Sequence, residues 1–465
     1  MVALRHGKLR ALWIGAFALV TVLPLLTSAL ARPVAARNIR TRPNILLLLT
    51  DDQTMRSLEH MPYLSSQPEG NWVSFERAVI STPMCCPSRV TILTGQYSHE
   101  HGVISNNGRK FDDDESLAVW LDREGYRTGL IGKYLNEYPF GRGETYIPPG
   151  WDYWNAVLDS GNEADYYRYS MSDNGTVRTY GSEPQDYQTD VLTSDAVDFI
   201  ESGPPIRPFF LMVSYRAPHR AADGGAAIPA PRHEGAYEDL GFELPPSFNE
   251  ANVADKPRWV RKLPERNAGS QIRAYRAEAE SMLAVDESVA TLMDTLSDRR
   301  ALDNTVIVFM TDNGYARGEH RWVTKQCPYA PCYQTPLLIR YPGAEQRTDA
   351  RLVSNVDIAP TLADVGDATP QLPQDGKSLV PLLTGKDGPW RDSALLAWRA
   401  RRGTIPAWWS ILTRRWQFTT LASGERELYD VKKDPFQLRN LASRRGYGDV
   451  RRSLERRLRK LKRAP

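Results

Sequence analysis

The sequence predicts an α/β protein with a large, mostly parallel mixed sheet sandwiched by helices, and a smaller antiparallel sheet subdomain toward the C-terminus. Three observations lead to this fold class. Continuous apolar runs of five or six residues, typical of buried parallel strands, recur along the first 340 residues. Helical stretches intervene between these runs, as in wound α/β sheets. Shorter strand-like segments gather near the C-terminus.

The apolar runs give the expected strands of the main sheet. They cover residues 44–49, 209–213, 305–310 and 336–340. The expected helices cover residues 116–123, 192–200 and about 271–296. Residues 139–190, rich in Tyr, Trp, Gly and Asp, and residues 220–265, rich in Pro and Ala, are expected to form long surface loops. In such a sheet, polar ligands collect at the carboxyl ends of the strands.

A change of pattern near residues 385–389 predicts a domain boundary. The short antiparallel strands expected beyond it cover residues 394–398, 408–412, 416–421 and 427–431. We therefore divide the chain into a main domain at residues 38–388, a C-terminal subdomain at residues 389–443 and a basic tail at residues 444–465. With 465 residues, 41% of them hydrophobic, the chain is long enough to bury a sizeable core.

Residues 1–31 have the pattern of an export signal. Arg5, Lys8 and Arg10 precede an apolar run at residues 11–26, and residues 29–31 offer a small-x-small cleavage site. The apolar run approaches the ~20 residues that a membrane span needs, so an uncleaved membrane anchor is the alternative. We expect a secreted, periplasmic or cell-surface protein, in a compartment where calcium is available and disulfides persist.

The balance of charge excludes a generally basic nucleic-acid binder, because 59 basic and 56 acidic residues give a net charge of only +3. Ten of the basic residues lie in the tail at residues 444–465, with only two acidic ones. The apolar residues of the tail follow a helical spacing and are Val450, Leu454, Leu458 and Leu461. The tail is therefore expected to be an amphipathic helix, either docked on the protein or in contact with an acidic polymer or an anionic surface.

Two pairs of polar residues directly follow expected strands. Asp51 and Asp52 end the strand at residues 44–49, and Asp312 and Asn313 end the strand at residues 305–310. Carboxylate and amide oxygens are hard ligands that suit calcium. Taken alone, each pair is more often a strand cap or a turn, so a shared metal site is a hypothesis that needs further support.

Residues 85–95, Cys-Cys-Pro-Ser-Arg-Val-Thr-Ile-Leu-Thr-Gly, carry the densest chemical signal. Pro87 suits the first turn of a helix. Arg89, one turn after Cys85, would supply a positive charge to an anion or a thiolate. On chemistry alone, an anion site and a buried structural cysteine are equally good interpretations.

This run resembles the signature of the type I sulfatases, C-x-P-S-R-x-x-x-L-T-G, at every fixed position. Four further elements resemble that family in its own order, and they are Asp51-Asp52, Gly132-Lys133, Ala217-Pro218-His219 and Thr311-Asp312-Asn313-Gly314. The segment 427–430, with Asp434-Pro435 and Asn440-Leu441, is similar to the family's C-terminal signature. The resemblance implies that residues 38–388 form a sulfatase catalytic domain of the alkaline phosphatase superfamily.

The resemblance also implies a modified nucleophile and a metal. Cys85 would be oxidised by a formylglycine-generating enzyme to formylglycine, an aldehyde whose hydrate attacks the sulfur and then ejects sulfate as the aldehyde re-forms. One calcium ion would be held by Asp51, Asp52, Asp312, Asn313 and the modified Cys85, and would neutralise sulfate oxygens.

The same resemblance implies roles for the other side chains. Asp312 would be the base for the attacking hydroxyl. Arg89 and Lys133 would stabilise charge on the nucleophile and on the sulfate oxygens. His219 would protonate the leaving alcohol or bind sulfate. Lys325, in the loop Thr324-Lys325-Gln326, would be a further sulfate-binding lysine.

One departure and one finer similarity bear on the substrate. Many sulfatases carry a histidine two residues after the lysine, where this chain has Leu135, which places more weight on His219. Residues 84–87, 97–101 and 132–138 are most similar to the N-acetylglucosamine-6-sulfatase and heparan endosulfatase branch. That similarity implies a sulfated small molecule or glycan as substrate, plausibly an amino sugar.

Several residues outside these motifs carry predictions of their own. Cys327 and Cys332, separated by a loop with two prolines, are expected to form a disulfide in an exported protein. Trp408-Trp409 fits core packing of the C-terminal subdomain better than a sugar platform. The histidines that fit packing around the site better than direct lining of it are His99, His101 and His320.

Three other activities remain as alternatives to a sulfatase. A phosphonate monoester or phosphodiester hydrolase would share the scaffold, the nucleophile and the metal. A non-catalytic glycan-binding protein would result if Cys85 stayed unmodified. A two-zinc phosphatase is disfavoured because the seven histidines of the chain are scattered and one lies in the export signal.

Overall fold

The computed structural model describes residues 42–463 except 69, 160–164, 242, 387 and 400–402. The expected export signal at residues 1–31 and the last two residues of the tail lie outside the described residues. Within the described ranges, no helix combines the length and the apolar character that spanning a bilayer requires.

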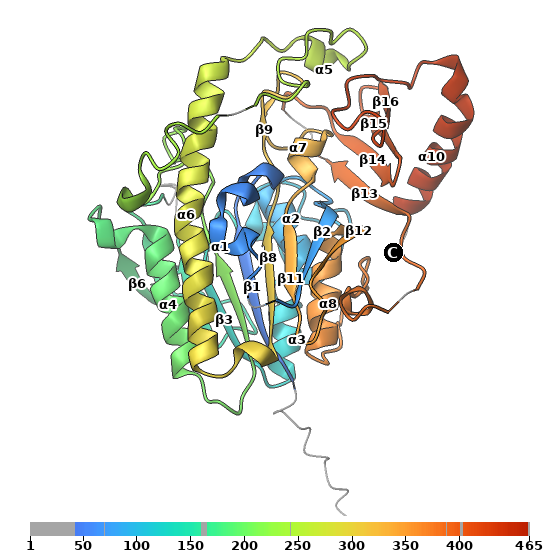
Figure 1. Ribbon diagram of the computed structural model, residues 1–465. Helices are drawn as coiled ribbons and strands as arrows, with labels where there is room; N and C mark the ends of the chain where they lie inside the picture. The colour runs from blue at the N-terminus through green and yellow to red at the C-terminus, as the bar shows by residue number, and fades with distance from the viewer. Residues whose placement is uncertain are drawn as a thin grey trace, which may run out of the picture. The chain divides into compact units, whose positions relative to one another are not determined.

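A ten-stranded mixed sheet forms the centre of the fold (Figure 1). In spatial order its strands are β12 (Arg347–Ser354), β2 (Trp72–Val79), β11 (Leu337–Arg340), β8 (Thr305–Thr311), β1 (Asn44–Thr50), β7 (Phe209–Ser214), β3 (Arg127–Gly132), β4 (Tyr153–Val157), β5 (Ser170–Asp173) and β6 (Thr176–Thr179). The central strands β8, β1, β7, β3 and β4 run parallel to one another. β11 is antiparallel to both of its neighbours, and β5 and β6 form an antiparallel edge. The expected mostly parallel mixed sheet is therefore confirmed.

Helices cover both faces of the sheet, and β1 shows how its sequence encodes this. Ile45, Leu47 and Leu49 lie in one core with apolar residues of α2 (Cys85–Thr94), α3 (Leu117–Arg123) and α8 (Ile358–Val365). Leu46 and Leu48 lie in a second core with residues of α4 (Gln188–Ser202) and α6 (Ala268–Asp298). Because successive side chains of a strand point to opposite faces, a strand buried on both faces reads as a continuous apolar run.

The remaining elements are short. The other helices of the main domain are α1 (Pro62–Ser65), α5 (Arg258–Arg261), α7 (Ala330–Tyr333) and α9 (Val380–Leu383). A two-stranded ribbon pairs β9 (Ala316–Arg317) with β10 (Val323–Thr324). The ribbon follows the carboxyl end of β8, which is where the polar residues of the predicted site begin.

The expectation of long surface loops at residues 139–190 was wrong. This stretch contains β4, β5, β6 and the start of α4, which extend the main sheet at one edge. β6 is exposed along its whole length, and the strands have only four or five residues each. Runs of only four or five residues are too short to show a clear strand period, so hydrophobic pattern alone does not reveal these strands. The strands β2, β3 and β12 also lay outside the predicted elements.

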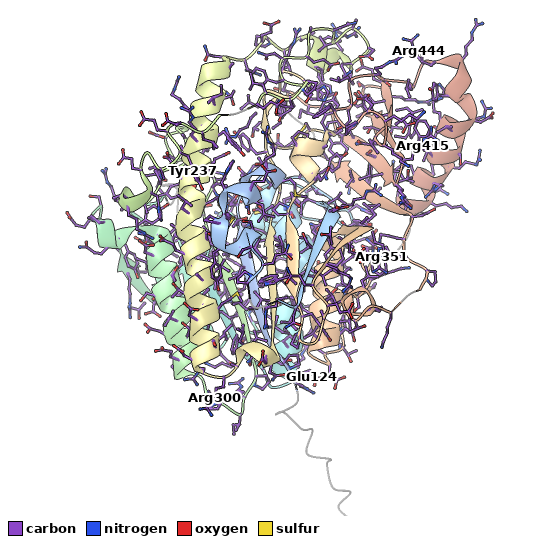
Figure 2. All side chains as sticks on the ribbon, viewed as in Figure 1. Glu124, Tyr237, Arg300, Arg351, Arg415 and Arg444 are labelled. Atoms are coloured by element: carbon purple, nitrogen blue, oxygen red, sulfur yellow. A yellow bond between two sulfur atoms is a disulfide. The ribbon has the colours of Figure 1, made fainter. Side chains whose placement is uncertain are left out.

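The C-terminal strands form a separate four-stranded antiparallel sheet, as expected. Its strands are β13 (Ser393–Trp398), β14 (Trp408–Thr413), β15 (Trp416–Leu421) and β16 (Arg426–Asp430). Trp408 is fully buried and donates from Nε1 to the carbonyl of Gln326 at 2.9 Å, which confirms core packing for this residue, whereas Trp409 is only partly buried. Figure 2 shows Arg415 on this sheet and Arg444 near the start of the last helix.

The tail is a helix, α10 (Gly448–Leu461), that docks on the C-terminal sheet (Figure 1). Leu454 and Leu458 are buried in one cluster with Phe418 of β15 and Leu428 of β16. The predicted apolar stripe therefore faces the protein, as the docked alternative required.

Candidate active site

Four neighbouring parallel strands end at the candidate site. Asp51 and Asp52 follow β1, Asp312 and Asn313 follow β8, His219 lies in the segment after β7, and Lys133 follows β3. The N-terminus of α2 brings in Cys85 and Arg89, and Lys325 follows β10. The structure thus brings all nine residues predicted from the sequence into one cluster of contacts, at the sheet edge where wound α/β proteins bind ligands.

Asp51 and Asp52 both face the interior of the site, although they are adjacent. In a regular strand their side chains would point to opposite faces. Asp52 instead has a φ of 66°, in the left-handed region, and this turns the chain at the end of β1. As a result the Lys325 ammonium contacts Asp52 Oδ1 at 2.6 Å and lies 4.0 Å from Asp51 Oδ1.

Cys85 is the first residue of α2, and the helix is buried along its whole length. Its Sγ lies 3.6 Å from Asp51 Oδ1, and Lys325 Nζ donates to it at 2.8 Å. Burial, followed by the Asp51 charge, raises the pKa of the Cys85 thiol to about 12. An unmodified thiol at this position therefore stays protonated at neutral pH and is a poor nucleophile.

The Arg89 guanidinium forms hydrogen bonds both to the acidic residues and to residues at the ends of the neighbouring strands. Its Nε donates to Asp312 Oδ2 at 2.8 Å, and Nη2 donates to Asp51 Oδ2 at 3.4 Å. Its Nη1 donates to the Lys133 carbonyl at 2.9 Å and to Ser214 Oγ at 2.7 Å. Because Arg89 is fully buried, it holds the carboxylates in place from within the protein.

Lys133 enters the site through a turn that requires glycine just before it. Gly132 has a φ of 100°, and a Cβ atom there would lie 2.1 Å from the Ser214 carbonyl oxygen. The Lys133 amide donates to that same oxygen at 2.9 Å, which ties the end of β3 to β7. The Lys133 side chain then donates from Nζ to Asp51 Oδ2.

The two residues after β8 complete the acidic group. Asp312 Oδ1 accepts from the Asp52 amide at 3.3 Å, and Asn313 Nδ2 donates to Asp52 Oδ1 at 2.5 Å. Asn313 Oδ1 is buried and has no hydrogen-bond partner. A buried amide oxygen without a partner, beside carboxylates, is a free ligand position.

His219 faces Asp52 across the site. Its Nε2 lies 3.5 Å from Asp52 Oδ2, and its Nδ1 lies 2.9 Å from the Arg220 carbonyl. Since a carbonyl only accepts, Nδ1 carries the proton, and Nε2 of the neutral ring is left as an acceptor. Burial lowers the pKa of His219 to about 4, even though Asp51 and Asp52 act in the opposite sense.

The charges of the site divide the carboxylates into two kinds. Although burial opposes it, the nearby Lys133, His219 and Arg89 hold the pKa of Asp51 well below its usual range. Burial and the Asp51 charge raise the pKa of Asp312 to about 6. Asp51 is thus a permanent anion, and Asp312 is the carboxylate with the stronger affinity for a proton.

The donor set fits a hard divalent cation. Asp51, Asp52 and Asp312 supply carboxylate oxygens, and Asn313 supplies the unpartnered amide oxygen. Ligand atoms of Asp51, Asp52, Cys85 and His219 also lie within 4.8 Å of one another. Three carboxylates and an amide are the ligand chemistry of calcium rather than of zinc, which favours nitrogen and sulfur.

A cavity of about 280 Å³ opens onto this cluster. Asp52, Lys133, His219 and Lys325 line its inner part. The residues around them that the sequence interpretation did not single out include Asn106, Asp159, Gln188, Arg216, Arg220 and Tyr315. Arg220 follows the Ala-Pro-His motif directly, so its position after His219 is the one signal by which the sequence could have indicated it.

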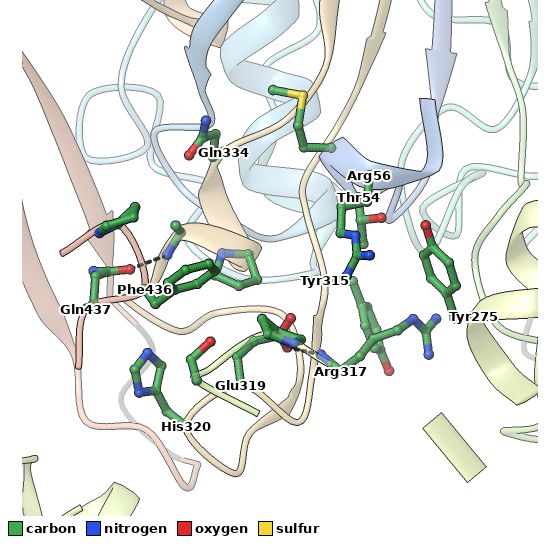
Figure 3. Close-up of a pocket in the computed structure, with 16 residues that line it drawn as sticks. Thr54, Arg56, Tyr275, Tyr315, Arg317, Glu319, His320, Gln334, Phe436 and Gln437 are labelled. Carbon is green, nitrogen blue, oxygen red and sulfur yellow. Dashed lines mark hydrogen bonds between the residues drawn. The ribbon is translucent and has the colours of Figure 1, made fainter. Parts of the chain in front are cut away.

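A second cavity, of about 290 Å³, shares Tyr315 as a wall (Figure 3). Figure 3 shows Arg317, Glu319 and His320 on one side of it. The charged groups here are matched within the fold, because Arg317 Nε donates to Glu278 Oε2 at 2.7 Å and His320 Nδ1 lies 2.7 Å from Glu250 Oε2. His320 therefore packs beside the site and does not line it, as expected.

The other two histidines are packing residues as well. His101 is partly buried, with Nε2 3.1 Å from Thr91 Oγ1 of α2 and Nδ1 accepting from the Val103 amide at 3.2 Å. His99 stacks on Tyr97 and meets Trp409 edge to face. Neither of them lines the cavity at the site.

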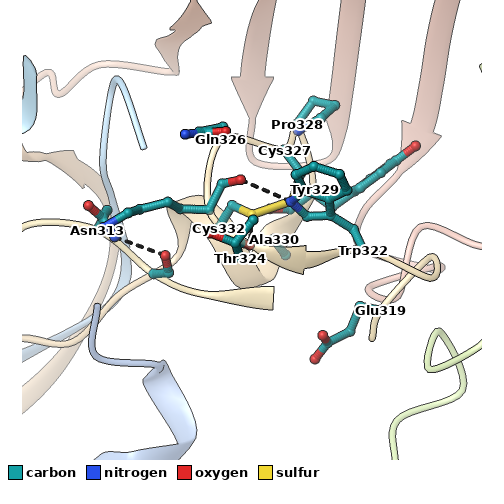
Figure 4. The surroundings of a disulfide bond; sticks show 12 residues. Asn313, Glu319, Trp322, Thr324, Gln326, Cys327, Pro328, Tyr329, Ala330 and Cys332 are labelled. Carbon is teal, nitrogen blue, oxygen red and sulfur yellow. Dashed lines mark hydrogen bonds between the residues drawn. A yellow bond between two sulfur atoms is a disulfide. The ribbon is translucent and has the colours of Figure 1, made fainter. Parts of the chain in front are cut away.

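The expected disulfide between Cys327 and Cys332 is present and braces the site (Figure 4). Figure 4 shows the bridge near Thr324 and Gln326, which flank Lys325. The Cys332 carbonyl accepts from the Gly314 amide at 3.1 Å, which links the same bridge to the turn after Asn313. The free cysteines among the described residues are Cys85 and Cys86.

A sequence profile described as Sulfatase matches residues 43–368, which is well over half of the chain. The chain belongs to the sulfatase family. A second profile, described as the C-terminal part of N-sulphoglucosamine sulphohydrolase, matches residues 318–464. The resemblance noted in the signature at residues 85–95 is thereby confirmed across most of the described chain.

Curated relatives that this chain resembles are also named as sulfatases. Human N-acetylglucosamine-6-sulfatase is 33% identical over 77% of this chain and 67% of its own length. Extracellular sulfatase Sulf-1 homologues of Caenorhabditis elegans and Drosophila melanogaster are 34% and 33% identical over 79% and 78% of this chain. This sulfatase spans only 54% and 34% of the length of those two proteins.

Solved structures agree on the fold. A structure described as a complex with its substrate D-glucosamine-2-N,6-O-disulfate has a TM-score of 0.76 and 26% identity, covering 90% of this chain and 97% of that one. A phosphonate monoester hydrolase of Agrobacterium radiobacter has a TM-score of 0.71 and 22% identity, covering 90% and 95%. The second likeness shows the fold alone, and it means that the scaffold by itself does not select sulfate over phosphonate.

Proposed function

We propose that this sulfatase hydrolyses a sulfate ester on an amino sugar or a glycan, outside the cytoplasm, with formylglycine at position 85 and one calcium ion. The observation that carries the proposal is the convergence on Cys85 Sγ of an acidic cluster and the Lys325 ammonium. Asp52 of the acidic cluster and Lys325 line a cavity that is also lined by a second lysine, Lys133. That arrangement suits a reaction at an anionic group beside residue 85.

Modification of Cys85 is supported by the state of the unmodified thiol, because burial raises its pKa to about 12. The formylglycine hydrate supplies an oxygen nucleophile and an internal route for releasing sulfate. A bound calcium ion, held by Asp51, Asp52, Asp312 and Asn313, supplies positive charge to the sulfate oxygens. The maturation partner would be a formylglycine-generating enzyme.

The two lysines are suited to hold the sulfate. Lys133 and Lys325 line the cavity, and neighbouring carboxylates keep the pKa of each raised, so both stay positively charged at neutral pH. Their charges are fixed before the substrate arrives, because each ammonium already contacts a buried carboxylate. Preorganised charge of this kind stabilises negative charge that develops in the transition state.

The proton transfers fall to Asp312 and His219. Asp312, with a pKa raised to about 6, can accept the proton of the attacking hydroxyl. His219 is neutral at neutral pH because burial lowers its pKa to about 4, so it must first take a proton at Nε2 from solvent in the cavity before it delivers that proton to the leaving alkoxide; the Arg220 carbonyl keeps the ring oriented through Nδ1. Arg89 positions Asp51 and Asp312 and does not itself reach the cavity.

Three kinds of support point to the substrate and the compartment. Relatives are named for N-acetylglucosamine 6-sulfate and for extracellular action, and one similar structure contains a disulfated glucosamine. The Cys327–Cys332 disulfide fits an oxidising compartment. The exposed face of α10, with Arg456 and Lys460, and the exposed Arg463 just after the helix would allow contact with an anionic surface.

A paired substitution at Cys85 and Cys86 tests the proposal. Cys85→Ala should reduce release of sulfate from an aryl sulfate and from N-acetylglucosamine 6-sulfate to the uncatalysed background. Cys86→Ala, a matched loss of the neighbouring buried thiol, should keep activity within about ten-fold, because Cys86 contacts Asn136 and not the acidic cluster. In the unsubstituted protein, peptide mass should show residue 85 lighter than cysteine by about 18 Da.

The outcomes separate the alternatives. Full turnover by Cys85→Ala would refute covalent catalysis at residue 85. Faster turnover of an aryl phosphonate than of the matched aryl sulfate would favour the phosphonate monoester hydrolase. An unmodified Cys85 together with saturable glycan binding and no hydrolysis would identify a non-catalytic glycan-binding protein.

A further inference from the structure

The outer wall of the active-site cavity carries an arginine that the proposed reaction does not use. Arg220 lines the cavity and is exposed, whereas its neighbour His219 lies deeper. Across the described residues, no carboxylate forms an ion pair with Arg220. An arginine with five donors and no acidic partner, placed at the rim of a cavity, is available to bind an anion.

The other cations of this cavity are all matched by acidic residues. Lys325 pairs with Asp52 at 2.6 Å, and Lys133 pairs with Asp51. Arg216 lies 3.4 Å from Asp165. Arg220 is therefore the cavity-lining cation, among the residues that the structure describes, that still lacks an anionic partner.

The backbone at Arg220 is held in place, so its side chain starts from a fixed point. The Arg220 carbonyl accepts from Arg216 Nη2 at 2.9 Å and from His219 Nδ1 at 2.9 Å. The Arg220 charge also acts on Tyr315 in the cavity wall. Burial and the Asp52 charge raise the pKa of Tyr315, and the Arg220 charge partly offsets that rise. A cation held in this way loses less conformational freedom on binding than one on a mobile loop.

The rest of the cavity lining is suited to a sugar. Asn106, Asn136, Gln188 and Gln326 line the cavity with neutral amide groups. Besides Asp52, the acidic residue of the lining is Asp159, whose Oδ2 accepts from the Glu137 amide at 2.8 Å. Neutral amides can bond hydroxyl groups, which leaves Arg220 as the lining group that selects for a further negative charge.

We propose that Arg220 binds a second anionic group of the substrate, a carboxylate or a second sulfate, while Lys133 and Lys325 hold the sulfate that is cleaved. This assignment rests on the proposed sulfatase function and narrows the substrate to sulfated sugars that carry two negative charges. Arg220 acts in binding and takes no part in the chemical step, because the side chains that contact Cys85 Sγ are Asp51 and Lys325 and not Arg220.

Four substrates and three variants test the assignment. N-acetylglucosamine 6-sulfate has a single charge, glucosamine-2-N,6-O-disulfate adds a second sulfate, and a disaccharide joining N-acetylglucosamine 6-sulfate to a uronic acid adds a carboxylate. An aryl sulfate is the reference. The variants are Arg220→Gln, Arg220→Lys and Arg414→Gln, which removes an exposed arginine from the turn between β14 and β15.

Arg220→Gln should lower kcat/KM about ten-fold for at least one doubly charged substrate, through KM rather than kcat. It should change the value for the singly charged sugar and the aryl sulfate by less than about two-fold. Arg220→Lys should recover part of the loss, Arg414→Gln should show none, and raising the salt concentration should shrink the preference of the unsubstituted protein. The doubly charged substrate that responds identifies the anion as sulfate or carboxylate.

Two results would overturn the assignment. An equal loss on all four substrates would mean that Arg220 only supports the fold, and unchanged kinetics on both doubly charged sugars would mean that it binds no anion. Both contradict the assignment while the sulfatase function stands. If modified, metal-loaded protein released sulfate from none of the substrates, the proposed function itself would fall, and the assignment with it.

Discussion

Two of the regions in which this member of the sulfatase family buries carboxylates stabilise them in opposite ways. At the carboxyl ends of β1 and β8, three carboxylates are matched by the cations of Arg89, Lys133 and Lys325. In the C-terminal sheet, Glu427 is fully buried and its Oε1 accepts from the hydroxyl groups of Tyr329 and Tyr429, at 2.9 and 2.6 Å.

The difference shows in the protonation of each carboxyl group. Cations hold the pKa of Asp51 well below its usual range. Burial raises the pKa of Glu427 to about 7, since the hydrogen bonds from the two tyrosines only partly oppose it. Burying an ionised carboxylate costs free energy. Glu427, which forms no ion pair with a cation of the described chain, therefore binds a proton more readily than an ordinary glutamate. Asp51 stays ionised because cationic side chains surround it, as is typical of carboxylates in active sites.

The largest effect on activity is expected from neutralising Asp51, the carboxylate that contacts both Arg89 and Lys133. Asp51→Asn leaves Lys133 without its buried carboxylate partner, leaves Arg89 with Asp312 as its one remaining carboxylate, and removes a candidate metal ligand. Release of sulfate should fall by at least about 10³-fold, and the free energy of unfolding should fall by about 3 to 5 kcal/mol. Turnover assays and urea unfolding check the two numbers, and more than a tenth of the original activity would contradict the role of Asp51.

A smaller effect on activity is expected from removing one cation of the site. Lys325→Ala should lower kcat about 10²- to 10³-fold, because it removes a fixed positive charge beside residue 85. The matched control is Lys256→Met, since Lys256 is also buried and contacts Glu250 and Asp255, each at 2.9 Å, but lies outside the site.

That control separates loss of charge from loss of stability. Lys256→Met should lower the free energy of unfolding by about 3 kcal/mol or more, and should therefore unfold at a lower urea concentration. The turnover of its folded molecules should stay within about two-fold of the unsubstituted protein. Equal losses of turnover in Lys325→Ala and Lys256→Met would mean that the loss does not depend on the position of Lys325 beside residue 85. That result would contradict a special role for the charges of the site.

The smallest effect on activity is expected at Glu427, where the consequence is a pH-dependent stability. The pKa of Glu427 is about 7 in the folded protein against 4.5 for an ordinary glutamate, so between these values the folded state binds more protons than the unfolded state. Stability should therefore decline as pH rises through this window, by about 3 kcal/mol in total, and level off above it.

Glu427→Gln should remove that part of the pH dependence and leave turnover at neutral pH unchanged. Urea unfolding of both proteins at about pH 5 and pH 8 measures it, because the difference between them isolates Glu427 from the other titrating groups. The same pH dependence in both proteins would show that Glu427 ionises in the interior as the site carboxylates do.

The sequence was sufficient for the parts of the fold and site that have a local signal. Residues 44–49 and 305–310 are buried on both faces, so their apolar runs identified β1 and β8, and the polar pairs that end them identified the site. The signature at residues 85–95 identified Cys85 and Arg89. The strands at residues 153–157, 170–173 and 176–179 were missed because runs of only four or five residues are too short to show a clear strand period.

Other features depend on contacts between distant residues and have no local signal. Nothing near Arg89 indicates that its side chain is enclosed by Asp51, Asp312 and Ser214 and does not line the cavity. The missing partner of Arg220 is likewise a property of the whole arrangement of charges. Such features emerge only when the ends of several strands are brought together.

The enclosure of α2 bears on the formylglycine proposed at position 85. Every residue of the helix from Cys85 to Thr94 is buried, so the folded protein encloses the sulfur at position 85. A modifying enzyme large enough to recognise this segment would have to reach it before the sheet and helices close around it. The yield of modified protein would then depend on the relative rates of modification and folding.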